Sequence, residues 1–505
     1  MPRYILVNRR AHKFSTEAKH ASRAQVATTL ARLEGSVKVL ADKDPKDDLA
    51  RRVVVFDADP AAVAKIQASL SPDAILEPLI LRSLHRRPVL PMGFNNVSPA
   101  LDAAANASAS QYHVTITAGG QALSGIEVIF YFRGPGSSVT DRTVHTNDQG
   151  IASVRVPHGA TVAMVEPIPE SGFWIMLVDA PPSGSTIDCL PIAKAGAGGA
   201  GWWHKAMSVD VNNPNRGNGI KVGVIDTGCG PHPNLAHVNL VGAFVDGNVL
   251  PGSQATDVAQ HGTHTSGIIG ARPTKSGDYA GMAAGCELFH ARVFKGEGPQ
   301  DGPSTADLIN AIDSLSRDHG CDLINMSLGG GPPSEAEEDC IRDAVERGTL
   351  CVCSAGNDDA AIEFPAAYPE CAAVSAIGQL GWAPAGTFSA SNRPQESSKM
   401  GENNLFLAAF SCFGPTLACA APGVGIVSTV PSNGHGPDVY MEMDGTSMAS
   451  PAACGVLADI LSQDAHYNAL PRDATRTTAA RSLLAQHCLP FGLPVKFEGR
   501  GLPEL

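Results

Sequence analysis

Three well-separated stretches of the sequence each carry a residue type used in nucleophilic catalysis. Asp226 ends the apolar run KVGVID, His261 opens HGTHTSGIIG, and Ser447 lies within DGTSMASPAACG. A histidine that removes the proton of a serine, with a carboxylate that orients the imidazole, makes a hydroxyl nucleophilic. Each residue alone also fits an ordinary role, as a turn aspartate, a buried histidine or a helix cap. The prediction of an activated Ser447 therefore depends on the three occurring together.

Small residues surround Ser447. Gly445 permits a close approach of the backbone, and the alanines that follow allow a helix to pass through a packed core without displacing the serine. We expect Ser447 at the N-terminus of this helix, beside backbone N–H groups that have no intrahelical partner. Pro451 is predicted to lie within about the first turn, where a missing N–H costs little.

A second histidine, His264, follows His261 by three residues and so lies about one helical turn away. Two histidines at this spacing could bind a metal ion. However, the HExxH glutamate is absent and no third ligand is evident. The sequence therefore predicts no metal site here and no cofactor for the chemistry.

The three motifs belong to an α/β domain that we predict over residues 200–505. Catalytic groups gather at the carboxyl ends of parallel strands, which is where Asp226 lies. Near-continuous apolar stretches alternate with helical ones in this region, as is typical of a parallel sheet covered on both faces. The predicted fold is three-layer α/β, with strands at KVGVID, ELFHARVF, DLINMSL, LCVCSAG and CAAVSAIG.

Two smaller domains are predicted before it. Residues 1–87 show strand and helix patterns in the order βαββαβ, which indicates a small α+β domain with an antiparallel sheet and two helices. Its first helix is expected around residues 17–33 and its last strand over AILEPLILRSL. Residues 95–190 contain short strands bounded by turn signals such as NDQG and PHGA, which is typical of a β-sandwich.

Composition limits the partners. The net charge of −13 argues against nucleic acid, and no apolar run approaches the roughly 20 residues of a membrane span. The first residues lack the apolar core of a signal peptide, which predicts a cytoplasmic location, with unconventional secretion as the alternative. All 12 cysteines lie from Cys189 onward, and we expect buried free thiols rather than disulfides.

Taken together, the motifs VIDTG, HGTHTSG, NMSLGG, SAGN, FPAAYP, AAPG and GTSMASP resemble those of the subtilisin family of serine peptidases, over residues 202–505. The resemblance implies a serine endopeptidase that works through an acyl-enzyme, with Asp226, His261 and Ser447 as its triad. Asn357 matches the family's oxyanion-binding position, together with the backbone N–H of Ser447. The alternative is a catalytically silent peptide-binding scaffold with the same fold.

The resemblance also implies where polypeptide substrates bind. Glu363, just before FPAAYP, matches the base of the pocket for the residue that precedes the cut, and Asp358 lies near its rim. A carboxylate in such a pocket needs a partner, so we expect cleavage after Arg or Lys. The alternative is that both acids are solvated. NMSLGG resembles the edge that binds the substrate backbone, through Ser327, Leu328 and Gly329, and the alternative is a plain exit from strand to loop. Ser354, Ala355 and Gly356 of SAGN are also expected to bind substrate.

The N-terminal segment resembles the inhibitor-like propeptides of this family, which implies a self-processed zymogen and an intramolecular inhibitor. Processing is predicted after Arg82, Arg86 or Lys194. The β-rich segment between propeptide and catalytic domain departs from the usual family order. The loop ARPTKSGDYAG lies where many members hold a structural calcium ion, but Lys275 and the lack of an asparagine ligand disfavour calcium there.

Overall fold

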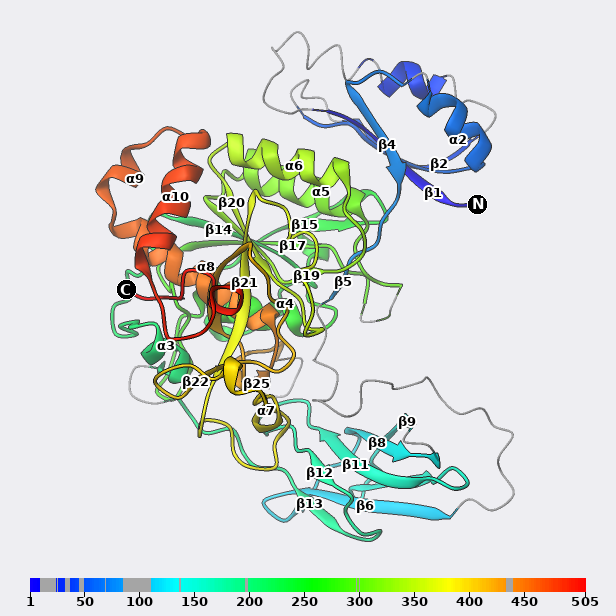
Figure 1. Cartoon of the computed structure of the whole chain (residues 1–505), viewed down its shortest axis with the longest axis vertical. Coiled ribbons are helices and arrows are strands. Elements are labelled where there is room, and N and C mark those ends of the chain that lie inside the picture. Colours follow the sequence, from blue (N-terminus) through cyan, green and yellow to red (C-terminus); the bar gives the residue numbers. More distant parts are fainter. Residues whose placement is uncertain are drawn as a thin grey trace.

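Figure 1 shows a computed structural model of the 505-residue chain, with an α/β body, a small N-terminal sheet at one end and a β-rich region at the other. The structure describes residues 1–9, 24, 26–31, 37–44, 50–68, 70–84, 110–135, 138–195, 199–296, 298, 300–432 and 439–505.

The body is built on a nine-stranded sheet in the order β16-β15-β17-β14-β18-β20-β21-β22, with β23 also paired to β21. Its central pairings are parallel, as predicted, whereas β16 and β22 run antiparallel to their neighbours, so the sheet is mixed. The apolar runs quoted above form its strands. The bounds are β14 (Lys221–Asp226), β15 (Asn239–Val245), β16 (Asn248–Leu250), β17 (Glu287–Arg292), β18 (Leu323–Met326), β20 (Leu350–Ser354), β21 (Cys371–Gln379), β22 (Leu405–Leu407) and β23 (Leu417–Pro422).

Helices cover both faces of this sheet (Figure 1). Side chains alternate along a strand, so Val222 and Val224 of β14 pack in one apolar core while Ile225 packs in the other. The first core includes α4 (His261–Gly270) and α8 (Thr446–Gln463), and the second includes α5 (Thr305–Asp313) and α6 (Glu335–Glu346). The central strands are apolar on both faces for this reason.

The remaining elements of the body complete its edges and loops. The helices are α3 (Trp202–Ala206), α7 (Phe388–Ser391), α9 (Ala465–Ala469), α10 (Ala474–His487) and α11 (Val495–Glu498), with short turns η4 (Pro233–Leu235), η5 (Gly252–Gln254), η6 (Ser314–Asp318) and η7 (Ser397–Lys399). The strands are β19 (Leu328–Gly329), β24 (Ile426–Thr429), β25 (Tyr440–Met443), β26 (Cys488–Leu489) and β27 (Leu502–Pro503).

The N-terminal sheet has the antiparallel order β2-β3-β1-β4, formed by β1 (Arg3–Asn8), β2 (Val37–Lys43), β3 (Val53–Ala58) and β4 (Ala74–Pro78). Tyr4 and Leu6 of β1 pack in a core with residues of α2 (Pro60–Gln67). Ile5 and Val7 point the other way and join the core that contains α5 and α6. One face of the sheet is therefore buried against the body.

The last strand and the first helix predicted for this region can be compared with the structure. The predicted last strand over residues 74–84 is interrupted: β4 ends at Pro78, and only β5 (Ser83–Leu84) resumes, paired with β19 of the body rather than with its own sheet. The N–H of Leu79 still donates to Arg3 O at 3.0 Å, and β4 ends there because its partner strand β1 begins at Arg3. Of the predicted helix at residues 17–33, positions 26–31 are helical, and most of the rest lies outside the described residues, as does Arg86.

The β-rich region consists of two sheets that share one apolar core, which includes Val114 and Ile116 from one sheet and Val128 and Phe130 from the other. The first has the order β10-β6-β13 with β7 beside β6, and the second β12-β11-β8-β9. The bounds are β6 (Gln111–Ala118), β7 (Gln121–Ala122), β8 (Glu127–Arg133), β9 (Val139–His145), β10 (Ile151–Arg155), β11 (Thr161–Ile168), β12 (Val178–Asp179) and β13 (Thr186–Asp188).

All 12 cysteines are free and buried, as expected. Among the described residues, no helix combines the length and the apolar character needed to cross a bilayer.

Candidate active site

Asp226 and His261 meet where β14 ends and α4 begins. The Nδ1 atom of His261 lies 2.8 Å from Oδ1 of Asp226, and both side chains are buried. The backbone N–H of Thr227 donates to the same carboxylate oxygen at 2.7 Å, and the Thr265 hydroxyl donates to Oδ2 at 3.0 Å. The carboxylate is therefore fixed in orientation before it acts on the imidazole.

These contacts also control the charge of Asp226. Burial by itself would raise the pKa of Asp226, but the neighbouring ring of His261 and the N–H of Thr227 outweigh burial and lower that pKa below its usual value. Asp226 is accordingly a carboxylate at neutral pH. An ionised Oδ1 can only accept a hydrogen bond, so Nδ1 of His261 carries the proton and Nε2 is left as the basic nitrogen.

The loop before α4 sets the position of His261. Gln260 adopts the left-handed region with φ of 63°, and the N–H of Gly262 donates to the Thr227 hydroxyl at 2.8 Å. That hydroxyl donates in turn to Asp257 at 2.8 Å. Nε2 of His261 is buried and has no hydrogen-bond partner within the described chain, so its lone pair is available.

Ser447 lies in the first turn of α8, directly after the N-cap Gly445 and Thr446. Its hydroxyl donates to the carbonyl oxygen of Ser327 at 3.3 Å, and the Ser327 hydroxyl donates back to Ser447 O at 2.9 Å. This reciprocal pair joins the start of α8 to the strand end at β18 and β19. The predicted place of Ser447 at a helix N-terminus is confirmed.

Pro451 is inside α8, beyond its first turn, so the predicted placement was wrong. In a regular helix, the N–H of residue 451 would donate to Ser447 O, four residues earlier. Proline has no N–H, and the Ser327 hydroxyl supplies the missing donor at 2.9 Å. This tertiary hydrogen bond explains why proline is tolerated inside the helix, whereas helix rules alone predict proline in the first turn.

Asn357 follows β20 and faces the start of α8. Its Oδ1 accepts from the N–H of Thr446 at 3.0 Å and from the Thr446 hydroxyl at 2.9 Å. Because Oδ1 is engaged in this way, the Nδ2 donor is directed to the other side of the amide. A Cβ at Gly445 would come within 3.2 Å of Nδ2, so glycine at this position allows the amide to approach.

The predicted substrate edge is already paired. Leu328 and Gly329 form β19, which lies antiparallel to Leu84 and Ser83 of β5. Ser327, just before β19, holds Ser447 as described. The structure therefore brings the chain's own N-terminal segment to the edge on which the sequence predicts a substrate.

Ser354, Ala355 and Gly356 of the SAGN motif form hydrogen bonds with neighbouring strands and with the start of α8. The Ser354 hydroxyl donates to Met326 O at 3.4 Å, the Ala355 N–H donates to Val374 O at 3.0 Å, and the Gly356 N–H donates to the Thr446 hydroxyl at 3.1 Å. Gly356 has φ of 119°, and a Cβ there would lie 3.0 Å from Cγ of Glu363.

The two acids predicted to line a basic pocket differ in exposure. Glu363 is half-buried against Gly356, with Oε2 3.7 Å from where a Cβ of Gly330 would lie, whereas Asp358 is exposed. Arg82, one of the proposed processing residues, does not pair with either acid. Its guanidinium pairs with Glu337, which the sequence reasoning missed because SEAEED resembles an ordinary solvated acidic helix start.

His264 is buried, and its Nε2 lies 3.1 Å from Ile426 O and 3.0 Å from Met441 O, so it donates to backbone carbonyls. Burial lowers the pKa of His264 to about 3. In the loop ARPTKSGDYAG, the carboxylate of Asp278 accepts from the N–H groups of Thr274 and Lys275 at 3.0 and 3.1 Å. Both N–H groups donate to the same oxygen, Oδ2, so Asp278 serves to order this loop.

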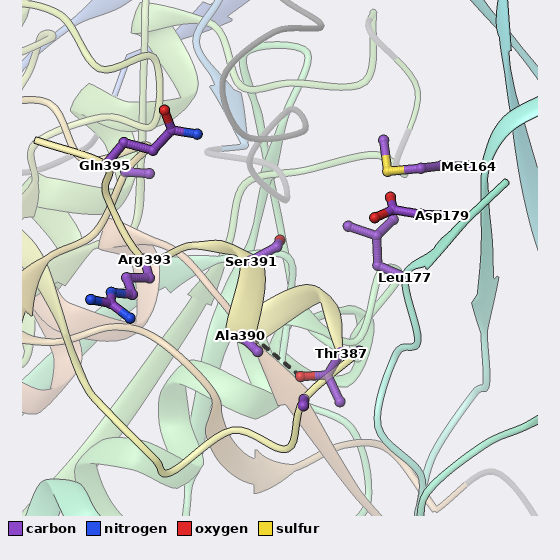
Figure 2. Close-up of a pocket in the computed structure, with 11 residues that line it drawn as sticks. Met164, Leu177, Asp179, Thr387, Ala390, Ser391, Arg393 and Gln395 are labelled. Carbon is purple, nitrogen blue, oxygen red and sulfur yellow. Dashed lines mark hydrogen bonds between the residues drawn. The ribbon is translucent and has the colours of Figure 1, made fainter.

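A separate pocket of about 480 Å³ lies where the β-rich region meets residues 385–395 of the body (Figure 2). Met164, Leu177 and Asp179 line it from one side, and Thr387 and Arg393 are among the residues from the other. None of the predicted site residues lines this pocket.

Comparison with known proteins agrees with this geometry. A family model described as "Subtilase family" matches residues 217–490. The chain belongs to the subtilase family. This confirms the resemblance noted in the sequence, and the match includes all of Asp226, His261, Asn357 and Ser447.

Several proteins have sequences similar to this subtilase domain. Subtilisin Savinase of Lederbergia lenta is 32% identical over 244 residues, which are 48% of this chain and 76% of that protein. The major intracellular serine protease of Bacillus subtilis is 33% identical over 260 residues, covering 49% and 70% of the two chains. M-protease of Shouchella clausii is 33% identical over 244 residues, and this chain spans only about half, 54%, of its length.

Proposed function

We propose that this chain is a serine endopeptidase that hydrolyses peptide bonds through an acyl-enzyme. The observation that carries the proposal is the hydrogen bond of 2.8 Å between Asp226 and His261, in a domain of the subtilase family that also holds Ser447 at the start of a helix. The names of the relatives, as proteases and subtilisins, support the same activity.

In the proposed reaction, Nε2 of His261 takes the proton of the Ser447 hydroxyl as its Oγ attacks the scissile carbonyl carbon. The resulting oxyanion is stabilised by Nδ2 of Asn357 and by the backbone N–H of Ser447. His261 then returns the proton to the leaving amine, which leaves an acyl-enzyme, and water attacks this ester with His261 again as base. Asp226 stabilises the imidazolium at both stages.

We further propose that residues 1–84 act as an intramolecular inhibitor of a zymogen. Two groups of contacts support this: β5 occupies the edge at β19, and Glu77 of β4 accepts from the N–H of Glu335 at the start of α6, at 3.0 Å. Cleavage after basic residues remains part of the proposal, with Glu363 as the carboxylate for the residue directly before the cut. The half-buried position of Glu363 supports it.

Labelling with a fluorophosphonate tests the peptidase proposal, because only an activated serine reacts readily. After a cut behind residue 84 has released the proposed inhibitor, the protein should be labelled at Ser447, as found by peptide mapping, and Ser447→Ala should abolish labelling. Ser462→Ala, in the last turn of the same helix, is the matched control and should be labelled like the parent. Absence of labelling in the cut parent protein would favour the alternative, a silent peptide-binding scaffold.

A further inference from the structure

The N-terminal region places one arginine side chain inside the subtilase domain. Arg82 precedes β5, and only 2% of its surface is exposed. The backbone of this segment is held on one side by Thr305, whose N–H donates to Ile80 O at 2.9 Å, and by Pro303 O, which accepts from the Arg82 N–H at 2.8 Å. On the other side β5 pairs with β19. The segment lies extended between two edges of the domain.

The guanidinium of Arg82 is surrounded by acceptors. Nε donates to Oε1 of Glu337 at 3.3 Å, and Nη2 donates to Oε2 of the same carboxylate. Nη1 donates to Pro332 O at 2.8 Å and to Gly330 O. A carboxylate and two carbonyl oxygens therefore engage all three nitrogens, an arrangement that suits the planar fork of arginine better than the single ammonium of lysine.

Glu337 is built into this pocket rather than displayed on a surface. Its side chain is fully buried in the first turn of α6. The Tyr368 hydroxyl donates to Oε2 at 3.0 Å, and the Glu337 N–H donates to the Ser334 hydroxyl at 3.1 Å. A buried carboxylate needs a cation or several donors. An apolar side chain in place of Arg82 would remove the cation from the buried carboxylate and the guanidinium donors from the carbonyl oxygens of Gly330 and Pro332.

The strand register fixes which substrate residue this pocket would contact. Leu84 lies opposite Leu328, and Ser83 lies opposite Gly329. In an antiparallel pair, the next substrate residue would face Ser327, whose carbonyl accepts the hydrogen bond of the Ser447 hydroxyl. In this register, the substrate residue opposite Ser327 carries the scissile carbonyl and is the first residue before the bond. Leu84 and Ser83 then correspond to the second and third residues before the bond, and Arg82 corresponds to the fourth.

We propose that the pocket around Glu337 selects substrates with arginine at the fourth residue before the scissile bond. The proposal rests on the proposed peptidase function, because it assigns the substrate class of that same groove. It is separate from the role of Glu363, which lies against Gly356 and concerns the residue directly before the cut. The two carboxylates would together favour substrates with two spaced basic residues.

Two peptides that differ only at the fourth residue before the bond, Arg or Met, test the proposal with the full-length protein after a cut behind residue 84 has released the segment that carries Arg82. We expect kcat/KM to favour the Arg peptide by about 30-fold or more, the lower end for a buried hydrogen-bonded charge pair. A Lys peptide should fall between them. Glu337→Gln should reduce the Arg preference to a few-fold. Glu338→Gln, whose partner is Arg342 on the surface, is the matched control and should keep the preference.

The outcomes separate this inference from the proposed function. Fluorophosphonate labelling and peptide cleavage without an Arg preference would overturn the pocket assignment alone, as would an Arg preference that survives in Glu337→Gln. No labelling and no cleavage would overturn the peptidase proposal and the inference with it. The Arg-to-Met ratio of the parent chain decides the matter even if Glu337→Gln does not fold.

Discussion

The imidazole of His261 lies 2.8 Å from the carboxylate of Asp226, which in turn receives hydrogen bonds from Thr227 and Thr265. The ring is therefore oriented by a carboxylate that is itself held by two further groups. This relationship makes Nε2 the basic nitrogen without the participation of substrate.

Replacing the carboxylate tests this arrangement. Asp226→Asn would offer an amide that can donate to Nδ1 and so stabilise the wrong imidazole tautomer, and we expect kcat to fall about 10⁴-fold. The measurement is peptide hydrolysis by the full-length protein after a cut behind residue 84. Asp246→Asn, which alters an exposed pair with Lys295, is the control and should leave kcat unchanged. A fall of less than tenfold in Asp226→Asn would argue against the assigned role.

The pH profile of the parent chain gives a second prediction. The pKa of Asp226 is lower than its usual value, so this carboxylate stays ionised throughout the range in which a histidine titrates. The folded state binds its proton only at lower pH than the unfolded chain does, so the stability that Asp226 contributes is present above about pH 4 and is lost as pH falls below it. We expect kcat/KM between pH 4.5 and 8 to show a single ionisation on its acid side. Two ionisations there would implicate a further group.

Asn357 can be tested with a variant that preserves its structural contacts. Asn357→Asp keeps Oδ1 as the acceptor for Thr446 but removes the Nδ2 donor. We expect kcat to fall about 100- to 1000-fold with KM little altered, because the donor acts on the oxyanion and not on the bound substrate. Asn248→Asp, on an exposed hairpin strand, is the control. A rise in KM of that size with kcat unchanged would contradict a role in binding the oxyanion.

Ser327 and Pro451 should be energetically coupled through Ser447 O. Ser327→Ala removes the hydroxyl that donates to this buried carbonyl, with an expected cost of about 1–3 kcal/mol in the free energy of unfolding. Pro451→Ala restores an N–H four residues after Ser447, so the double variant should recover part of that loss. Denaturant unfolding of the four chains gives the coupling energy, expected to be at least about 0.5 kcal/mol. Strict additivity would mean that Pro451 is not the reason for this contact.

Arg51 anchors the N-terminal sheet to the body and gives the fifth prediction. Its side chain is fully buried, 2.5 Å from Asp339 and 3.3 Å from Asp343, carboxylates of α6. Arg51→Met removes the partner of these acids and should destabilise docking of the sheet by about 3–5 kcal/mol. Weaker docking would be measured as faster hydrogen exchange of the backbone amides in β1 and β3 of the full chain.

The neighbouring arginine is the matched control for that experiment. Arg52 pairs with Asp42 within the N-terminal sheet itself, at 2.7 Å and nearer the surface. Arg52→Met should change stability by about 0–1 kcal/mol. Equal effects of the two variants would show that the buried contact with α6 does not hold the sheet in place.

The sequence was sufficient to predict the central strands because parallel strands covered on both faces must be apolar throughout. It also predicted Asp226, His261 and Ser447 as a group, because glycine-rich turns at strand and helix ends mark each of them. The contact of Asp226 with His261 at the end of β14 agrees with the parallel topology that the apolar runs implied.

Pro451 and Glu337 show what the sequence could not predict. The place of Pro451 depends on a hydroxyl from Ser327, far away in the chain, and no helix rule contains that information. Glu337 belongs to an acidic helix start that looks solvated in sequence, and only the arrival of Arg82 from a distant segment buries it. Both errors concern polar groups whose partners are set by tertiary structure.

The docking of residues 1–84 at both Arg51 and β5 has a kinetic consequence. If this segment inhibits the domain as proposed, it returns to the β19 edge of the intact chain by an intramolecular step, at an effective concentration set by the tether. After a cut behind residue 84, its return would be bimolecular and would weaken on dilution. The activity per molecule of a cut sample should then rise as the sample is diluted, so the cut alone would not bring the enzyme to full activity.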